Sequence, residues 1–225
     1  MLGKNLNNLC KTIKGLKMDD YCVSLGWKLK LMDKHRISIL MVETMDGTPV
    51  FGKASETMQV DISDILKLKV DPSLDYTVDI EDGTYILDGK TKEYRFDLIE
   101  SMESPNHKIP DCPNERVDNF DIDAFKDFMK SVKSYADHIG IVNDTKGHLR
   151  AVATEIGSEF RAMVGTMHTG EPVSSKYPVD VLAGMVSMMI KDTTLSFNTD
   201  YPAMFEWTDG VFAYKYIIAP RIDCA

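Results

Sequence analysis

Hydrophobic and polar positions along the chain switch between a helical period and a strand period. Residues 4–17 place Leu6, Leu9, Ile13 and Leu16 at helical spacing, with lysines on the opposite side. This pattern predicts an amphipathic helix at the start of the chain. Runs that alternate with a period of two predict strands at 21–25, 27–32, 36–42 and 57–60.

A second, shorter helix is predicted at 62–69. Asp61 or Ser63 can cap its N-terminal end, and Pro72 stops it. Strand patterns then return at 76–80, 84–87 and 92–98, with hairpin signals at 82–83 and 88–89.

The same order of patterns returns after residue 115. Residues 122–135 predict a helix whose buried face carries Phe125, Phe128, Met129 and Val132. Helix starts near residues 4, 62, 122 and 179 recur about every 60 residues, which predicts an internal repeat. The other elements expected here are strands at 139–143, 148–154, 159–166, 194–197, 204–207 and 211–218, and a helix at 179–191 with Leu182, Met185, Val186 and Met189 buried.

Residues 98–113 show neither the helical period nor the strand period of two, and they contain Pro105, Pro110 and Pro113. Proline fixes φ and removes a backbone donor, so this stretch is predicted to be an extended connector. The expected fold class is α+β, with two tandem domains that each place a helix pair on antiparallel sheet. The expected boundaries are 1–100 for the first domain, 101–115 for the connector and 116–225 for the second domain.

Composition and charge limit the kinds of partner and the cellular compartment expected for this chain. The chain has 225 residues, 44% hydrophobic and 27% charged, with a net charge of −9. An acidic protein contacts nucleic acid only where its positive charge gathers on one face. The N-terminal stretch lacks a secretory apolar core, and the scattered Cys10, Cys22, Cys112 and Cys224 predict free thiols in a reducing, intracellular compartment.

Three motifs carry a family resemblance that runs over essentially the whole chain. Residues 27–39, Trp-Lys-Leu-Lys-Leu-Met-Asp-Lys-His-Arg-Ile-Ser-Ile, form a strand, a Met-Asp turn and a second strand. The connector carries Lys108-Ile109-Pro110. Residues 216–223, Tyr-Ile-Ile-Ala-Pro-Arg-Ile-Asp, follow Thr199-Asp200-Tyr201-Pro202. Together they resemble the DNA polymerase sliding clamps of the proliferating cell nuclear antigen (PCNA) type.

The resemblance implies a ring, usually a homotrimer, that encircles double-stranded DNA without sequence preference. Such clamps tether DNA polymerase, are opened by a clamp loader, and bind further replication and repair proteins. No catalysis, cofactor or metal is implied, and the location is with DNA inside the cell. The helix lysines expected to face DNA are Lys4, Lys11, Lys14, Lys17, Lys67, Lys126, Lys130 and Lys133.

Two further sites follow from the resemblance. A hydrophobic pocket for partner peptides is expected at Met32, Ile37, Ile39, Ile109, Pro110, Pro202, Ile217, Ala219 and Pro220. The subunit interface is expected along two alternating strands, at Tyr94, Phe96 and Leu98 and at Phe160, Ala162 and Val164.

Other interpretations stay open from the residues alone. Lysines are common on any solvated helix face, and Ile37 and Ile39 also fit a buried strand face. Asp33 with His35 is a candidate metal-ligand pair, and clustered carboxylates in a metal-dependent hydrolase are the alternative from another class. The segment 166–177 is shorter than is usual for sliding clamps. It therefore motivates a third interpretation, a partial or regulatory clamp subunit that needs a partner to close.

Overall fold

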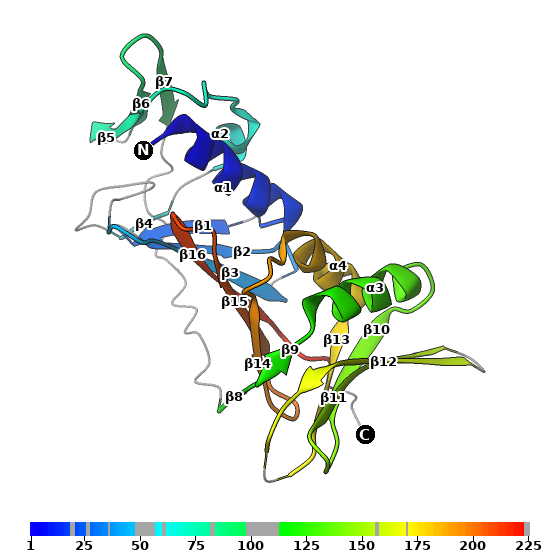
Figure 1. Ribbon diagram of the computed structural model, residues 1–225. Coiled ribbons are helices and arrows are strands. Elements are labelled where there is room, and N and C mark those ends of the chain that lie inside the picture. Colours follow the sequence, from blue (N-terminus) through cyan, green and yellow to red (C-terminus); the bar gives the residue numbers. More distant parts are fainter. Residues whose placement is uncertain are drawn as a thin grey trace. The chain divides into compact units, whose positions relative to one another are not determined.

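A computed structural model of the chain is shown in Figure 1. The structure describes residues 1–18, 21–25, 28–35, 37–47, 57–59, 62–81, 84–97, 113–155, 158–169 and 171–222, with side chains except at 21–25, 57–59, 80 and 97. The chain divides into two compact units. The first comprises Met1–Lys108 with Thr208–Tyr214, and the second Ile109–Trp207 with Lys215–Ala225.

The first unit has two helices and antiparallel strands. Strand order β4-β1-β2-β3 is followed by the first half of β16, Phe212–Tyr214, and a separate sheet has the order β5-β6-β7. The elements are α1 (Gly3–Gly15), β1 (Tyr21–Leu25), β2 (Lys28–Met32), β3 (Ser38–Thr44), β4 (Thr57–Gln59), α2 (Ser63–Lys67), β5 (Thr77–Glu81), β6 (Thr84–Asp88) and β7 (Glu93–Asp97).

The apolar stripe of α1 forms the centre of this unit. Leu9 and Ile13 are fully buried, and Leu6 and Leu16 nearly so, as the helical spacing predicted. α2 contacts α1 and is shorter than the predicted 62–69. Its N-cap position is occupied by Ile62, without a side-chain hydrogen bond, so the prediction that Ser63 caps it is wrong. Asp61, the other candidate, lies outside the described residues.

The second unit repeats the plan. Its elements are β8 (Glu115–Arg116), β9 (Asn119–Phe120), α3 (Ile122–Val132), β10 (His138–Asn143), β11 (His148–Glu155), β12 (Ser158–Thr166), β13 (Val173–Pro178), α4 (Val179–Met188), β14 (Thr194–Phe197), β15 (Ala203–Thr208) and β16 (Phe212–Ile218). One sheet has the order β13-β10-β11-β12-β9, and the second half of β16 begins the order β16-β15-β14-β8.

Figure 1 shows α3 and α4 side by side on one face of the five-stranded sheet. Asp121 caps α3, because its side chain accepts a hydrogen bond from the backbone N–H of Ala124 at 2.9 Å. The predicted inward residues of α3 are all buried. On α4, Leu182, Met185 and Met189 are buried, whereas Val186 is only half-buried. The described strand pairs are all antiparallel, so the α+β prediction is confirmed.

Candidate functional site

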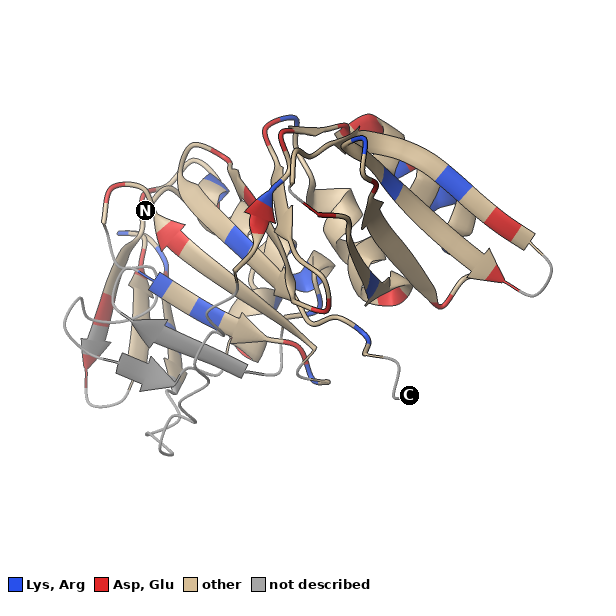
Figure 2. Cartoon of the chain, turned by 90° about the horizontal axis from the view of Figure 1, so that it is seen from below, with Lys and Arg blue, Asp and Glu red and all other residues tan. Residues whose placement is uncertain are grey.

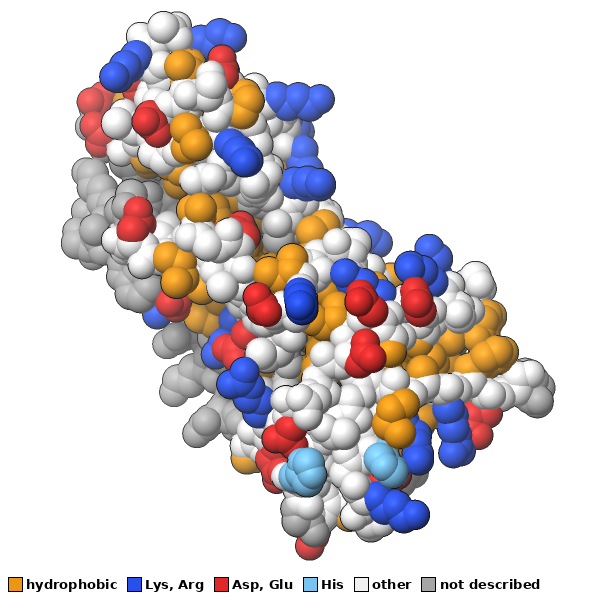
Figure 3. All heavy atoms as spheres, in the orientation of Figure 1, with side chains coloured by type: hydrophobic (Ala, Val, Ile, Leu, Met, Phe, Trp, Pro, Cys, Tyr) orange, Lys and Arg blue, Asp and Glu red, His pale blue; other side chains and the backbone are white. Residues whose placement is uncertain are grey.

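Free positive charge gathers on α1. Lys4, Lys11, Lys14 and Lys17 are exposed, and residues 1–18 contain no Asp or Glu. Blue side chains follow this region in the space-filling view of Figure 3. Lys67 on α2 is also exposed, but its Nζ lies 2.7 Å from the carboxylate of Asp64. The first unit therefore presents a cationic helix face suited to phosphate contact.

The lysines of α3 are in a different electrostatic setting. Lys126 Nζ donates to the backbone carbonyl of Met189 at 2.9 Å, and Lys130 Nζ lies 2.8 Å from the Asp127 carboxylate. Lys133 is exposed at the C-terminal end of the helix. Acidic and basic side chains are thus interleaved on α3, and its net positive field is weaker than that of α1.

The first unit brings three of the predicted pocket residues together. Met32 on β2 is the direct cross-strand partner of Ile39 on β3, and Ile37 comes just before that strand. Ile37 and Ile39 are half-exposed, while Ser38 and Leu40 are buried. The alternative that the two isoleucines alternate into the core is therefore wrong. They lie on the sheet face that points away from the core.

The second unit carries the other described pocket residues near the end of β16. Ile217 is buried, whereas Pro202, Ala219 and Pro220 are half-exposed. The side-chain amide of Asn114 donates to the backbone carbonyl of Pro202 at 2.8 Å, which anchors this loop. Ile109 and Pro110 of the connector lie outside the described residues. The joining of the two groups into one pocket stays a prediction.

A turn between β2 and β3 supports the first group. Asp33 is 7% exposed, and its carboxylate accepts hydrogen bonds from the backbone N–H groups of His35, Ile37 and Ser38, at 3.2, 2.8 and 2.7 Å. These bonds occupy most of the acceptor sites of the carboxylate that a metal ion would need. Asp33 therefore fixes the turn that presents Ile37, and the geometry does not favour the Asp33–His35 metal pair.

Two strands present the edges predicted for subunit contact. β7 ends the order β5-β6-β7, and its half-exposed Tyr94 and Phe96 lie beside Tyr76 and Tyr85, at ring-centroid distances of 6.4 and 6.1 Å. The third residue expected on this edge, Leu98, lies outside the described residues.

β12 pairs with β9 only at Gly165 and Thr166, so among the described residues 158–163 have no strand on that side. Phe160 is 43% exposed and packs on Tyr135, whereas Val164 is buried and Ala162 half-buried. Arg161 is paired with Glu159 on this strand, and Figure 2 shows acidic and basic bands interspersed along the strands of the chain. The first part of β12 is thus an open edge that carries an exposed aromatic ring.

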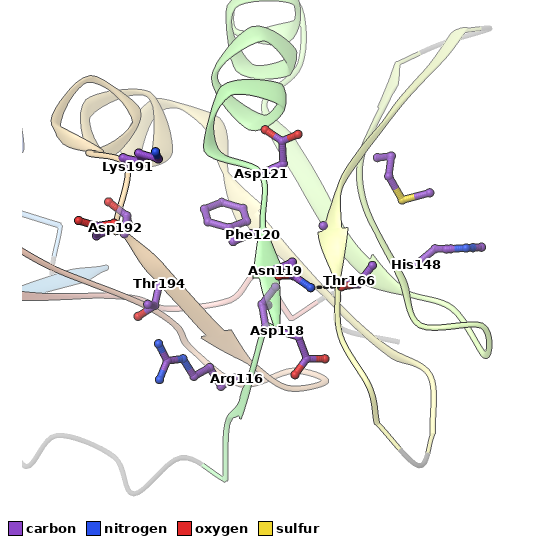
Figure 4. A pocket seen from close by; sticks show the side chains of 14 residues that line it. Arg116, Asp118, Asn119, Phe120, Asp121, His148, Thr166, Lys191, Asp192 and Thr194 are labelled. Atoms are coloured by element: carbon purple, nitrogen blue, oxygen red, sulfur yellow. Dashed lines mark hydrogen bonds between the residues drawn. The ribbon is translucent and has the colours of Figure 1, made fainter.

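A hollow of about 730 Å³ opens beside the N-terminal end of α3 (Figure 4). Asn119 donates to the Thr166 hydroxyl at 3.1 Å, and Asp118 accepts from the backbone N–H of His168 at 2.8 Å. Hydrogen bonds from His168 lower the pKa of the Asp118 carboxyl. These contacts fasten β9 to β12.

The described part of the chain has no group of three or more His, Cys, Asp or Glu side chains placed to hold a metal ion.

Some structural residues were not found from the sequence. Residues 173–178 form β13, a strand that is not among the elements predicted from the sequence. Its buried Ser175 breaks the apolar alternation that would have revealed a strand. The anchoring role of Asn114 and a contact between His138 and Arg221 also had no sequence signal, because their partners are 83 or more residues away.

Among the described residues, no helix combines the length and apolar composition needed to cross a bilayer.

No family model matches the sequence, and no curated protein sequence matches it significantly. The chain is similar to the PCNA structure from A. fulgidus with the C-terminal region of FEN-1 bound, at TM-score 0.75 and 22% identity, covering 100% of this chain and 98% of that one. It is also similar to PCNA from Thermococcus kodakaraensis, at TM-score 0.75 and 18% identity over 98% of both chains. The chain therefore has the PCNA-type sliding-clamp fold over its whole length.

Proposed function

We propose that this chain is a subunit of a sliding clamp that encircles duplex DNA and tethers replication and repair proteins inside the cell. The observation that carries the proposal is the end-to-end likeness to archaeal PCNA, with almost no part of either chain left uncovered. Fold likeness alone does not assign function, so the surfaces of this chain must supply the rest.

The surfaces agree with a clamp. The lysines of α1, without acidic neighbours in residues 1–18, provide sequence-independent attraction for phosphates. The open edges of β7 and β12 provide complementary strand partners for a head-to-tail ring, which a rotationally symmetric homotrimer would close.

The partner-peptide site is proposed at the two apolar groups described above, around Ile39 and around Pro220. A short peptide with apolar and aromatic anchors fits such a surface. The similar A. fulgidus clamp carries the C-terminal region of FEN-1, so a peptide of that region is a suitable first probe.

Topological binding is tested without a clamp loader by primer extension on linear DNA. At high concentration a ring threads over a free DNA end and raises polymerase processivity. Blocking both ends with streptavidin should abolish the stimulation, while cutting one end of the blocked template with a restriction enzyme should restore it. Stimulation that is equal on blocked and free ends would contradict encirclement.

Light scattering across a dilution series tests assembly. A homotrimer has three times the subunit mass of 25.4 kDa. A monomer at every concentration would instead support the partial-clamp alternative, in which a different subunit closes the ring.

A further inference from the structure

Two asparagine side chains join the end of the connector to the loop between β14 and β15. Asn198 Nδ2 donates to the backbone carbonyl of Pro113 at 2.8 Å, and Asn114 Nδ2 donates to the backbone carbonyl of Pro202 at 2.8 Å. The two bonds run in opposite directions and link positions that are 85 and 88 residues apart in the sequence. This pair of hydrogen bonds is called the asparagine clasp below.

The loop between β14 and β15 is the fixed side of the clasp. The backbone N–H of Tyr201 donates to the carbonyl of Asn198 at 3.2 Å, which closes a tight turn. The loop is also attached to β13 at two points. Thr199 Oγ1 accepts from the backbone N–H of Ser174 at 3.2 Å, and the Tyr201 carbonyl accepts from the Tyr177 hydroxyl at 3.0 Å. The connector end is therefore the side that the clasp holds in place.

The two amides use their polar ends differently. Asn198 Oδ1 accepts from the backbone N–H of Thr199 at 2.7 Å, so the Nδ2 group of this amide is the end that faces Pro113. The Oδ1 atom of Asn114 is buried and has no hydrogen-bond partner among the described residues. A buried acceptor without a partner lowers the stability of a fold, so stability alone does not explain an asparagine at position 114.

The chain that follows the clasp is weakly held. β8 has two residues and is the last strand in the order β16-β15-β14-β8, and Figure 1 shows it beside β14. Both of its side chains, Glu115 and Arg116, are exposed, so apolar burial contributes little to this strand. The first buried side chain after the connector is that of Val117. The clasp therefore fixes the point at which the connector meets the second unit.

The clasp lies next to residues of the proposed partner site. Pro202 belongs to that site, and Ile109 and Pro110, assigned to it from the sequence, precede Pro113 by four and three residues. Four residues of chain span at most about 14 Å. An anchor at Pro113 therefore limits the volume within reach of the connector residues of the site. The entropy cost of ordering them on peptide binding is correspondingly smaller.

We propose that Asn114 and Asn198 are positioning residues, which fix the end of the connector to the loop that carries Pro202 and so prepare the site for a partner peptide. The peptide in this statement rests on the proposed function. The clasp itself is a property of the chain alone and is tested without a partner.

Hydrogen exchange measured by mass spectrometry tests the clasp. Asn198→Asp keeps an oxygen that accepts from Thr199 but removes the donor to Pro113. The amides of residues 115–117 should then exchange roughly threefold to tenfold faster than in the wild type, as expected for the loss of one hydrogen bond. Asn119→Asp, the same substitution at an amide that joins β9 to β12, should leave exchange at 115–117 unchanged. Unaltered exchange in Asn198→Asp would overturn the clasp.

Fluorescence anisotropy with a labelled peptide of the FEN-1 C-terminal region tests the positioning role. Asn198→Asp and Asn114→Leu should each bind the peptide roughly threefold to tenfold more weakly than the wild type. The double variant should bind no more weakly than the weaker single variant, because either change opens the same clasp. Asn114→Gln keeps an amide donor and should recover part of the affinity, and Asn119→Asp should bind as the wild type does.

The outcomes separate positioning from stability and from the partner site itself. Asn114→Leu removes the buried acceptor without a partner, so its melting temperature should not fall even though its affinity does. Full affinity in both single variants, or losses that simply add in the double variant, would overturn the positioning role. Absence of peptide binding by the wild type would overturn the proposed partner site and the positioning role with it, while the exchange data would still decide the clasp.

Discussion

The Nζ atom of Lys126 on α3 lies 2.9 Å from the backbone carbonyl oxygen of Met189, the C-cap residue of α4. The last carbonyls of a helix have no partner within the helix, and a cation at that end also interacts favourably with the helix dipole. Lys126 shares a lysine stripe with Lys130 and Lys133 in the sequence. In the structure it fastens the two helices of the second unit to each other.

Lys126→Ala should therefore destabilise the second unit, whereas substitution of most exposed lysines would not. A hydrogen bond from a charged donor in a partly solvated position contributes about 1 kcal/mol to the free energy of unfolding. Urea unfolding measured by circular dichroism should show a lower midpoint. Lys133→Ala, an exposed change at the C-cap of the same helix, removes only a solvated cation near the helix dipole and should lower the midpoint less. Equal effects of the two changes would show that the bond to Met189 contributes nothing.

The helices should contribute unequally to DNA binding. Reversing Lys11 and Lys14 to Glu removes charge from a segment, residues 1–18, that contains no Asp or Glu, whereas Lys130 is already paired with Asp127. The α1 double reversal should weaken binding more than reversal of Lys130 and Lys133. It should also lower the slope of log affinity against log salt by about one for each phosphate that the variant no longer neutralises.

Binding to a short duplex is measured by anisotropy at several salt concentrations, with melting curves to confirm that both variants fold. Equal losses for α1 and α3 would contradict this asymmetry. A full affinity in both variants would show that neither helix faces the DNA.

The edge of β12 should control assembly through Phe160. Its ring is 43% exposed and packs on Tyr135 at a centroid distance of 4.9 Å. A carboxylate at this edge would be buried without a partner in a closed ring, so Phe160→Asp should shift the mass by light scattering toward 25.4 kDa. Met45→Asp, a change at another exposed apolar residue, should leave the mass unaltered. An unchanged assembly in Phe160→Asp would place the interface elsewhere.

The periodic elements were predictable because one face of each is buried. The stripes of α1 and α3 and the strands β10 and β11 follow directly from apolar spacing, and the lysine face of α1 follows from the same period. Two kinds of feature could not be predicted from the sequence. β13 places Ser175 where an apolar residue would mark the inner face. The contacts Lys126–Met189 and His138–Arg221 join residues 63 and 83 positions apart, a pairing that only the folded chain defines.

Cys10 lies within the first helix that the sequence predicts, but the sequence did not decide which face of that helix it occupies. It lies on the inner face of α1, 5% exposed, with its Sγ atom 3.9 Å from the backbone carbonyl oxygen of Ile65 on α2. Burial raises the pKa of the Cys10 thiol from 9.0 to about 11, because the thiolate would lose its hydration. The thiol stays protonated in the folded chain at pH values where the unfolded chain has begun to ionise.

This difference gives the first unit a defined dependence on alkaline pH. The folded state holds the Cys10 proton more tightly than the unfolded state, so the resulting stability is fully present below about pH 9. It is lost as the pH rises through the folded pKa of about 11. Urea midpoints measured between about pH 8 and about pH 11 should therefore fall more steeply in the wild type than in Cys10→Ala. The cavity left by the smaller side chain costs the same at every pH, and the other thiols, tyrosines and lysines titrate in both proteins, so the difference in slope isolates Cys10. Parallel curves would mean that the thiol ionises equally in the folded and unfolded states, and that α1 and α2 pack less tightly around it than the structure shows.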